Sequence, residues 1–184
     1  MLVRVLVDDT GSATPFFGKF GATPRVAVDL LARIGSLGLE AAGVTFHAGS
    51  QQSRPSTYAA GVRTALEVAA AAGLARPLLD VGGGFPVGYR SAVPPVSAFA
   101  DAVTGAVAGA VADGLVDAVA LALEPGRALV AEAGVLRTRV LRVSRRPGLD
   151  HRRWVYLDAG RYPGLAETEN EAIAYPVRPG PRTG

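Results

Sequence analysis

Apolar runs alternate with amphipathic helical stretches along the first two thirds of the chain, recurring about every thirty to forty residues. Strands that are apolar throughout, each followed by a helix, are typical of a parallel sheet covered on both faces. Such units close into an eight-stranded barrel or open into a doubly wound sheet, and four units are too few to close a barrel. The repeat indicates an α/β fold and a fragment of a larger one. The expected strands are Leu2–Val7, Gly43–His47, Leu78–Val81 and Val119–Leu123, and the expected helices are Thr23–Gly38, Ser56–Ala72 and Val96–Ala112.

The pattern changes after Gly134. Leu136–Val143 alternates arginine with Thr and Val, which favours an antiparallel strand with one solvated face. Arg153–Asp158 is the expected partner strand, after a turn at Pro147-Gly148. We therefore place a domain boundary between residues 133 and 134, with a β-rich segment over residues 134–184 whose last ten residues are irregular.

Composition excludes several classes of function. The net charge is +3, but Lys19 is the only lysine and the basic residues lack the aromatic interleaving of nucleic-acid readers. The densest basic stretch, Arg142–Arg153, is interpreted as a solvated hairpin loop. No apolar run is long enough to span a bilayer. The chain has no cysteine, which excludes disulfides and thiolate metal sites and is compatible with the cytoplasm; no metal is expected.

Polar and glycine-rich motifs follow three of the expected parallel strands, and barrel enzymes place their active sites at that end of the strands. Three glycines in succession leave backbone N–H groups free to converge on an anion, although a bare triple glycine is also compatible with a flexible turn. Ser50 and Arg127 could bind the same anion, or each could be a capping or surface residue. Together they favour a phosphate site. The motifs are Phe46-His47-Ala48-Gly49-Ser50, Leu79-Asp80-Val81-Gly82-Gly83-Gly84-Phe85-Pro86 and Glu124-Pro125-Gly126-Arg127.

Glu124 and His47 each allow two interpretations. Glu124 ends an apolar strand, so we expect it to be buried and to need a partner. That partner is either Arg127 or Arg4 in a salt bridge, or the nitrogen of a bound ring. His47 is either a hydrogen-bonded core histidine or a platform whose imidazole lies on a flat cofactor.

These motifs together resemble one family, the fold type III (alanine-racemase-like) pyridoxal-phosphate decarboxylases, and its ornithine/lysine branch in particular. The resemblance covers almost the whole chain. It implies that residues 1–133 are the second half of a TIM-type (β/α)8 barrel, about four βα units, and that residues 134–184 begin a β-rich C-terminal domain. The matching residues are the strand-end motifs, Lys19-Phe20-Gly21-Ala22, Asp158-Ala159-Gly160, Gly164-Leu165-Ala166-Glu167-Thr168 and Glu171-Ala172-Ile173.

The resemblance implies decarboxylation of ornithine or lysine in polyamine biosynthesis, with pyridoxal 5′-phosphate as cofactor and a homodimer as the full-length assembly. His47 would stack on the pyridine ring, and Glu124 would pair with its nitrogen and keep it protonated. Asn170 and Glu169 would lie near the distal amine of the substrate, although the family pattern has an acidic residue where Asn170 stands. The residues implied to hold the phosphate are Ser50, Gly82, Gly83, Gly84 and Arg127.

Two residues that the family's chemistry needs are not found in this sequence. The lysine that forms the Schiff base would lie upstream of residue 1, and a catalytic cysteine would lie beyond residue 184. We therefore expect a fragment that is inactive alone, and poorly soluble or oligomeric because half a barrel exposes strand edges. The alternatives are a non-catalytic homologue that acts by binding or regulation, and an unrelated phosphate-binding barrel.

Overall fold

The computed structural model describes residues 1–145, 148, 151–162, 164–171 and 173–180. The chain divides into two compact units. The β/α unit comprises Met1–Gly88 and Ala92–Ala131, and the C-terminal unit comprises Tyr89–Ser91 and Glu132–Gly184. Each unit is described by itself.

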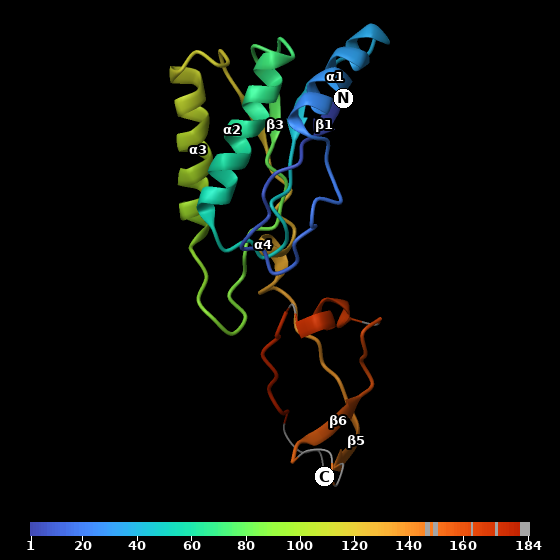
Figure 1. Cartoon of the computed structure of the whole chain (residues 1–184). Helices are drawn as coiled ribbons and strands as arrows, with labels where there is room; N and C mark the ends of the chain where they lie inside the picture. Colours follow the sequence, from blue (N-terminus) through green and yellow to red (C-terminus); the bar gives the residue numbers. More distant parts are fainter. Residues whose placement is uncertain (146–147, 149–150, 163, 172, 181–184) are drawn as a thin grey trace. The chain divides into compact units, whose positions relative to one another are not determined.

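The β/α unit contains the predicted four-stranded parallel sheet, and its strands lie in the order β1-β2-β3-β4. Helices α1, α2 and α3 of this unit are labelled in Figure 1. Helices α1, α2 and α3 connect successive strands, and α2 packs against both of its neighbours. This is the arrangement that right-handed βα units produce. The strands are β1 (Leu2–Arg4), β2 (Gly43–Thr45), β3 (Leu78–Asp80) and β4 (Ala120–Ala122), and the helices are α1 (Pro24–Ser36), α2 (Pro55–Ala71) and α3 (Val96–Ala112).

The first three strands fall where the sequence predicts them but are shorter than the apolar runs. Backbone hydrogen bonds continue the pairing past the strand ends: Phe46 N–H donates to Asp80 O (3.0 Å), and Val81 N–H donates to Ala122 O (3.1 Å). The helices agree more closely with the prediction, because proline can begin a helix without losing an intrahelical bond. Pro24 and Pro55 occupy this position, although the side chain of Thr23 makes no capping bond to α1.

The core of the β/α unit lies between the sheet and the helices. Aromatic rings occupy its centre, where Tyr58 stacks on Phe85 (centroids 4.9 Å apart) and both meet the edge of Phe99. Aliphatic side chains from β1, β2, β3 and α2 surround them. The largest fully buried side chains include Phe46, Leu66, Leu79, Val5, Val44 and Val62.

Strand β4 departs from the prediction of strands covered on both faces. Ala120 and Leu121 are exposed, and so is Leu123 just beyond the strand. An edge position alone does not explain this, because β1 forms the other edge of the sheet and its Val3 is buried. The helix that follows β4 is α4 (Arg127–Val130), which the sequence did not predict. It has four residues, against 13 to 17 in α1, α2 and α3, and so covers less of the strand.

The C-terminal unit contains the predicted antiparallel pair, β5 (Val140–Arg145) and β6 (Arg153–Leu157). Arg142 and Arg145 lie within β5, so the interpretation of this basic stretch as a loop was wrong in part. The expectation of one solvated face was wrong as well, because side chains on both faces of β5 are exposed. Of the predicted turn, Pro147 lies outside the described residues. An unpredicted 3-10 helix, η1, spans Ala166–Glu171, and residues 175–180 have no regular structure. Over the described part of the chain, no helix is long and apolar enough to cross a membrane.

Candidate active site

The loops that follow β2, β3 and β4 are joined directly by backbone hydrogen bonds at the carboxyl end of the sheet. Glu124 N–H donates to Gly82 O (2.8 Å), which ties the loop after β4 to the glycines after β3. Gln52 N–H donates to Gly84 O (2.9 Å), which ties the loop after β2 to the same glycines. The parallel order of the strands therefore brings together His47, the three glycines and Glu124, as the motif positions predict.

The three glycines are required by close packing and not by flexibility. A Cβ on Gly82 would lie 2.3 Å from Phe46 O, one on Gly83 2.2 Å from Glu124 O, and one on Gly84 2.0 Å from Gly49 O. Backbone oxygens cannot move away as a side chain would. The glycine segment is thus held between the neighbouring loops, which makes the alternative of a flexible turn wrong.

Hydrogen bonds from Tyr58 and to Asp80 also hold the glycine segment. Tyr58 Oη donates to Gly83 O (2.7 Å), and Gly82 N–H donates to Asp80 Oδ1 (2.8 Å). The expectation that all three glycine amides converge on an anion therefore needs correction, because the Gly82 amide is already bound. Within the described residues, the amides of Gly83 and Gly84 have no protein acceptor and remain available to an anion.

His47 is half-buried beside the glycines. Its Nδ1 accepts a hydrogen bond from Gly49 N–H (3.0 Å), so the neutral ring carries its proton on Nε2. Burial lowers the pKa of His47, and the nearby Arg4 guanidinium lowers it further while Asp80 opposes both. The ring is therefore uncharged at neutral pH. The Cβ position of Gly83 lies 3.7 Å from Nε2, which places the imidazole against the glycine segment.

Glu124 is exposed, and the expectation that it is buried was wrong. Its backbone amide is bound to Gly82, but its side chain, just beyond the exposed strand β4, lies in solvent. An exposed carboxylate needs no compensating buried partner. Its charge is thus available to a ligand at this end of the sheet.

Ser50 and Arg127 occupy the loops beside these residues, and both are half-buried. The carbonyl of Ser50 accepts hydrogen bonds from Ala13 N–H (3.0 Å) and Ser12 Oγ (2.9 Å), so a separate loop fixes its backbone. Arg127 begins α4, directly after Gly126, whose φ of +46° favours glycine. The phosphate-binding roles of both side chains remain predictions.

Two amide side chains hold the loop after His47: Gln51, which ends the matching His-Ala-Gly-Ser-Gln motif but was given no role from the sequence, and Gln52. Gln51 binds the backbone of Val87 twice, donating to its O (2.9 Å) and accepting from its N–H (2.7 Å). Gln52 is fully buried and donates to Ala48 O (2.9 Å). Their place at and directly after the end of this motif was the one signal in the sequence.

An aromatic and cationic cluster beside His47 was also missed. The edge of Phe16 meets the His47 ring (centroids 5.2 Å apart), and Arg4 lies 5.2 Å from the ring centroids of both Phe16 and Phe20. Lys19 Nζ lies 5.1 Å from the Phe20 centroid. The spacing of these residues in the sequence does not indicate the cluster, because the fold of the loop over residues 12–20 is what brings Phe16 and Phe20 to Arg4 and His47.

The Lys-Phe-Gly-Ala motif has a structural role at the outer edge of β1. Ala22 N–H donates to Arg4 O, and Leu6 N–H donates to Ala22 O, both at 2.8 Å. Gly21 has a φ of +93°, and a Cβ there would lie 2.6 Å from Leu6 N. The motif therefore covers part of a strand edge.

Glu169 and Asn170, the predicted substrate residues, lie in η1 of the C-terminal unit. Their side chains lie outside the described part of the structure. Their proposed role therefore stays a prediction.

Comparison with known proteins gives a consistent family match. Residues 1–131 match the family model described as "Pyridoxal-dependent decarboxylase, pyridoxal binding domain". An ornithine decarboxylase from Panagrellus redivivus is 32% identical over 149 residues, covering 77% of this chain and 33% of that protein. A lysine/ornithine decarboxylase from Selenomonas ruminantium is 30% identical over 181 residues, covering 96% of this chain and 44% of that protein.

Solved structures agree. The lysine decarboxylase from Selenomonas ruminantium matches all of this chain and 47% of its own, with a TM-score of 0.77 and 29% identity. The lysine/ornithine decarboxylase from Vibrio vulnificus complexed with cadaverine matches 98% of this chain and 47% of its own, with a TM-score of 0.72 and 28% identity. The chain thus spans less than half the length of each of these relatives.

Proposed function

The chain belongs to the family of pyridoxal-dependent decarboxylases, and from that premise we propose that it supplies the phosphate and ring contacts of a pyridoxal 5′-phosphate site for decarboxylation of ornithine or lysine. The substrate class follows from relatives named ornithine decarboxylase and lysine/ornithine decarboxylase. The family match removes the alternative of an unrelated phosphate-binding barrel.

One observation carries the proposal: Gly83 sits between the backbone of Glu124 and the ring of His47. An anion cradle, a flat ring and a carboxylate thereby meet at the carboxyl end of three adjacent strands. A phosphorylated aromatic cofactor needs these three features together. The residues present fit the group.

The phosphate is bound by the free amides of Gly83 and Gly84, with the Ser50 hydroxyl and the Arg127 guanidinium completing the cradle. Gly82 does not contact the phosphate, because its own amide donates to Asp80. Its part is to let the backbone place Gly83 and Gly84. Because the glycine backbone is fixed by its neighbours, the amides need little reorganisation when the anion arrives. Arg127 adds a charge-assisted contact of about 1.5–3 kcal/mol.

The ring is held by His47 and Glu124. A neutral imidazole stacks on a protonated pyridine without repelling its charge, and burial keeps the His47 ring neutral. The exposed Glu124 carboxylate pairs with the ring nitrogen and holds the proton there. When bound, the cofactor supplies an electron sink for the charge left as CO₂ departs. Glu169 and Asn170 are proposed to select the distal amine of the substrate.

The sheet is proposed to be the second half of a (β/α)8 barrel formed by residues 1–133, with residues 134–184 beginning a β-rich domain. Its order leaves β1 and β4 as edges, which in a closed barrel would be paired. In the full-length protein a homodimer is the proposed assembly. The chain alone is proposed to bind the cofactor without turnover, because its only lysine, Lys19, packs over Phe20.

The test is titration of the purified chain with pyridoxal 5′-phosphate, followed by the ³¹P resonance and the visible spectrum. Borohydride reduction and peptide mapping then show whether Lys19 is modified, and release of CO₂ from ornithine and lysine measures turnover. We expect saturable phosphate binding with no adduct on Lys19 and no CO₂. Absence of any binding would refute the proposed cofactor site. An adduct on Lys19 together with release of CO₂ would refute the proposal that the chain alone is inactive.

Matched variants identify the contacts. Arg127→Gln is expected to weaken cofactor affinity at least about tenfold, the equivalent of roughly 1.4 kcal/mol. Arg25→Gln, on α1 and remote in sequence from the motifs, is the control for loss of one charge. Equal affinities of the two variants would exclude Arg127 from the cradle.

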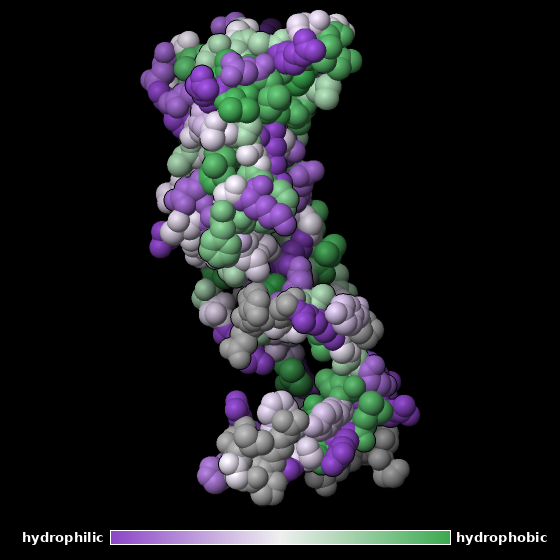
Figure 2. All heavy atoms as spheres, turned by 45° about the vertical axis from the view of Figure 1, so that its right-hand side comes forward, coloured by the Kyte–Doolittle hydropathy of each residue, from purple (hydrophilic) through white to green (hydrophobic). Residues whose placement is uncertain are grey.

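A second candidate function is a non-catalytic homologue that acts by binding a partner, and one observation favours it. Large apolar side chains are exposed on and beside the β4 edge, namely Leu121, Leu123, Leu129 and Val130. Hydrophobic residues also form a visible share of the surface (Figure 2). Exposed apolar surface at a strand edge favours association. Association without cofactor binding would select this candidate.

A further inference from the structure

The loop that joins the three glycines to α3 supplies residues to both compact units. Up to Gly88 it belongs to the β/α unit, whereas Tyr89–Ser91 belong to the C-terminal unit, and the chain returns to the β/α unit at Ala92. Gln51 holds the first part of this loop, because its side-chain amide binds the backbone of Val87 through two hydrogen bonds of 2.9 and 2.7 Å. The loop that begins at the candidate active site therefore carries three residues into the packing of the C-terminal unit.

Arg90, in the middle of these three residues, binds one backbone carbonyl with two nitrogens. Its Nε (3.2 Å) and Nη2 (2.8 Å) both donate to Tyr175 O, 85 residues further along the chain. A guanidinium presents its N–H groups in a fixed fork, so both bonds form in one orientation of the side chain. The ring of Tyr89 meets the edge of the Tyr175 ring, with centroids 5.0 Å apart and planes at 83°. Two adjacent loop residues thus hold both the backbone and the ring of Tyr175.

Tyr175 in turn contacts the helix η1. Its hydroxyl donates to Glu167 Oε2 (3.4 Å), eight residues earlier in the chain. Within η1, Thr168 N–H and Oγ1 both donate to Leu165 O (3.1 and 2.6 Å). Such local bonds shape the helix but do not fix where it lies in the unit. The contact with Tyr175 does, and through it the position of η1 depends on Arg90.

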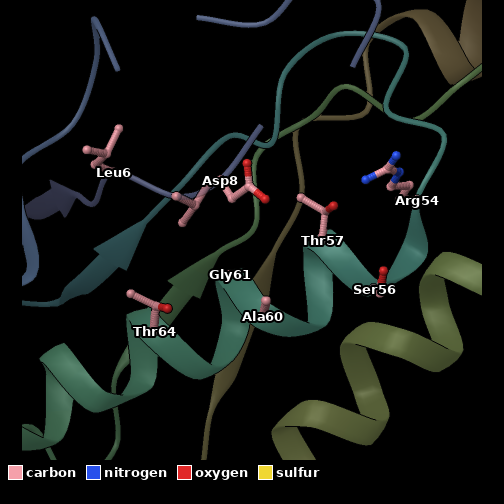
Figure 3. A pocket seen from close by; sticks show the side chains of 9 residues that line it. Leu6, Asp8, Arg54, Ser56, Thr57, Ala60, Gly61 and Thr64 are labelled. Carbon is pink, nitrogen blue, oxygen red and sulfur yellow. The ribbon is translucent and has the colours of Figure 1, made fainter. Parts of the chain in front are cut away.

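The arginine before α2 provides a contrast within the β/α unit. Arg54 and Asp8 line an open recess, both are exposed, and their opposite charges attract each other (Figure 3). The segments that carry them are already joined by Gln52, whose side chain donates to Thr10 O (3.3 Å) and accepts from Arg54 N–H (3.0 Å). Removal of the Arg54 guanidinium leaves this link intact, so Arg54→Gln is a matched control for Arg90→Gln.

We propose that Arg90 is a positioning residue that fixes η1 through Tyr175 and thereby sets the selection of the distal amine of the substrate. The inference rests on the proposed function in one respect, the assignment of Glu169 and Asn170 in η1 to that selection. Arg90 does not contact the substrate; it holds the helix that does. The loop that begins at the phosphate-binding glycines thus also positions the residues that read the other end of the substrate.

The first test needs no ligand and is independent of the proposed function. The heteronuclear amide NOE measures backbone order over η1 and over residues 173–175 in the full chain. Arg90→Gln is expected to lower the NOE over both stretches, and Arg90→Lys to lower it less, because lysine keeps the charge but not the fork. Arg54→Gln is expected to leave both stretches unchanged. Equal order in the wild-type and Arg90→Gln chains overturns the proposal.

Tyr175→Phe separates the two contacts of Tyr175. It keeps the carbonyl that Arg90 binds and the ring that Tyr89 meets, but it removes the hydroxyl that reaches Glu167. The variant is therefore expected to lower the NOE over η1 and to leave residues 173–175 ordered. If η1 stays as ordered as in the wild-type chain, Arg90 holds Tyr175 without holding η1, and the proposal fails at that step.

Selection is measured by the binding of putrescine and cadaverine, the diamines formed from ornithine and lysine, to the chain loaded with pyridoxal 5′-phosphate. Arg90→Gln is expected to change the ratio of the two dissociation constants at least about threefold and to leave cofactor affinity unchanged. A variant that is only less stable weakens both diamines equally, and that outcome overturns the role in selection. If the wild-type chain binds the cofactor but neither diamine, the assignment of η1 to the distal amine is wrong here and in the proposed function, and the NOE still decides whether Arg90 positions η1.

Discussion

The buried hydroxyl of Tyr58 donates a 2.7 Å hydrogen bond to the carbonyl of Gly83, linking the core to the segment proposed to hold a phosphate. The Tyr58 side chain is fully buried, and its ring stacks on Phe85 at an interplanar angle of 13°. Burial also raises the pKa of Tyr58, so the hydroxyl stays a donor into strongly alkaline solution. The position of the Gly83 carbonyl therefore depends on the packing of α2.

Replacing Tyr58 by Phe tests this link. The ring packing is kept, but the Gly83 carbonyl loses its buried donor, so the free energy of unfolding is expected to fall by about 1–3 kcal/mol. Denaturant unfolding followed by circular dichroism measures the change. Tyr162→Phe is the control, because that residue is 94% exposed. If both variants unfold at the same denaturant concentration, the Tyr58 bond contributes nothing to stability.

Gly83→Ala tests whether the glycine is required by packing. Its φ is compatible with any residue, so the added methyl group, 2.2 Å from Glu124 O, is the single cost. Such overpacking is expected to lower the free energy of unfolding by about 1–3 kcal/mol or more. Gly105→Ala is the control: its Cβ meets nothing within 4 Å in α3, and the change is expected to stabilise by about 0.5–1 kcal/mol. Matching effects of the two substitutions would show that Gly83 has room for a side chain.

The sequence predicted the order of the elements because helical and strand periodicities are local properties. Helix α3 has the predicted bounds Val96–Ala112, and the parallel order of four strands follows from the repeated unit. The burial of Glu124 was mispredicted because burial depends on what lies beside β4. An apolar strand has the same sequence whether it lies at the centre of a sheet or at its edge.

The candidate site was predictable in its position and less so in its contacts. Motifs at strand ends identified His47, the glycines and Glu124 because parallel strands place their carboxyl ends together. The bonds from Tyr58 to Gly83 and from Gly82 to Asp80 depend on side-chain packing and local rotamers. Neither side-chain packing nor a local rotamer can be read from a sequence. The bond between the Gly82 amide and Asp80 was therefore not foreseen, and the assignment of that amide to an anion was wrong.

The protonation of His47 is expected to shape the dependence of stability on pH. Its pKa is lowered below 6.5 in the folded chain, so the unfolded chain binds the proton more strongly. The resulting stability is fully present above pH 6.5 and is lost as the pH falls through the folded pKa. Proton NMR of the imidazole resonances measures the midpoint, and His47→Gln assigns the signal, since the chain has two histidines.

Arg4→Gln tests the cause of that shift. Removing the guanidinium takes away one contribution that favours the neutral ring, so the His47 midpoint is expected to rise toward 6.5 while burial still keeps it below. Arg33→Gln, near the end of α1, serves as the control for a general change in net charge. A midpoint that is unchanged by Arg4→Gln but moved by Arg33→Gln would contradict the local effect.

Self-association through the β4 edge is expected for the chain on its own. Leu123 is 56% exposed just beyond an edge strand, and a lysine at such an edge opposes pairing because it places charge against an apolar partner. Leu123→Lys is therefore expected to raise the dissociation constant at least about tenfold in sedimentation analysis. Leu37→Lys, at a residue 57% exposed at the end of α1, is the matched control. Equal loss of association in both variants would show that general surface hydrophobicity drives it. A monodisperse wild-type monomer would contradict the expectation that the chain self-associates.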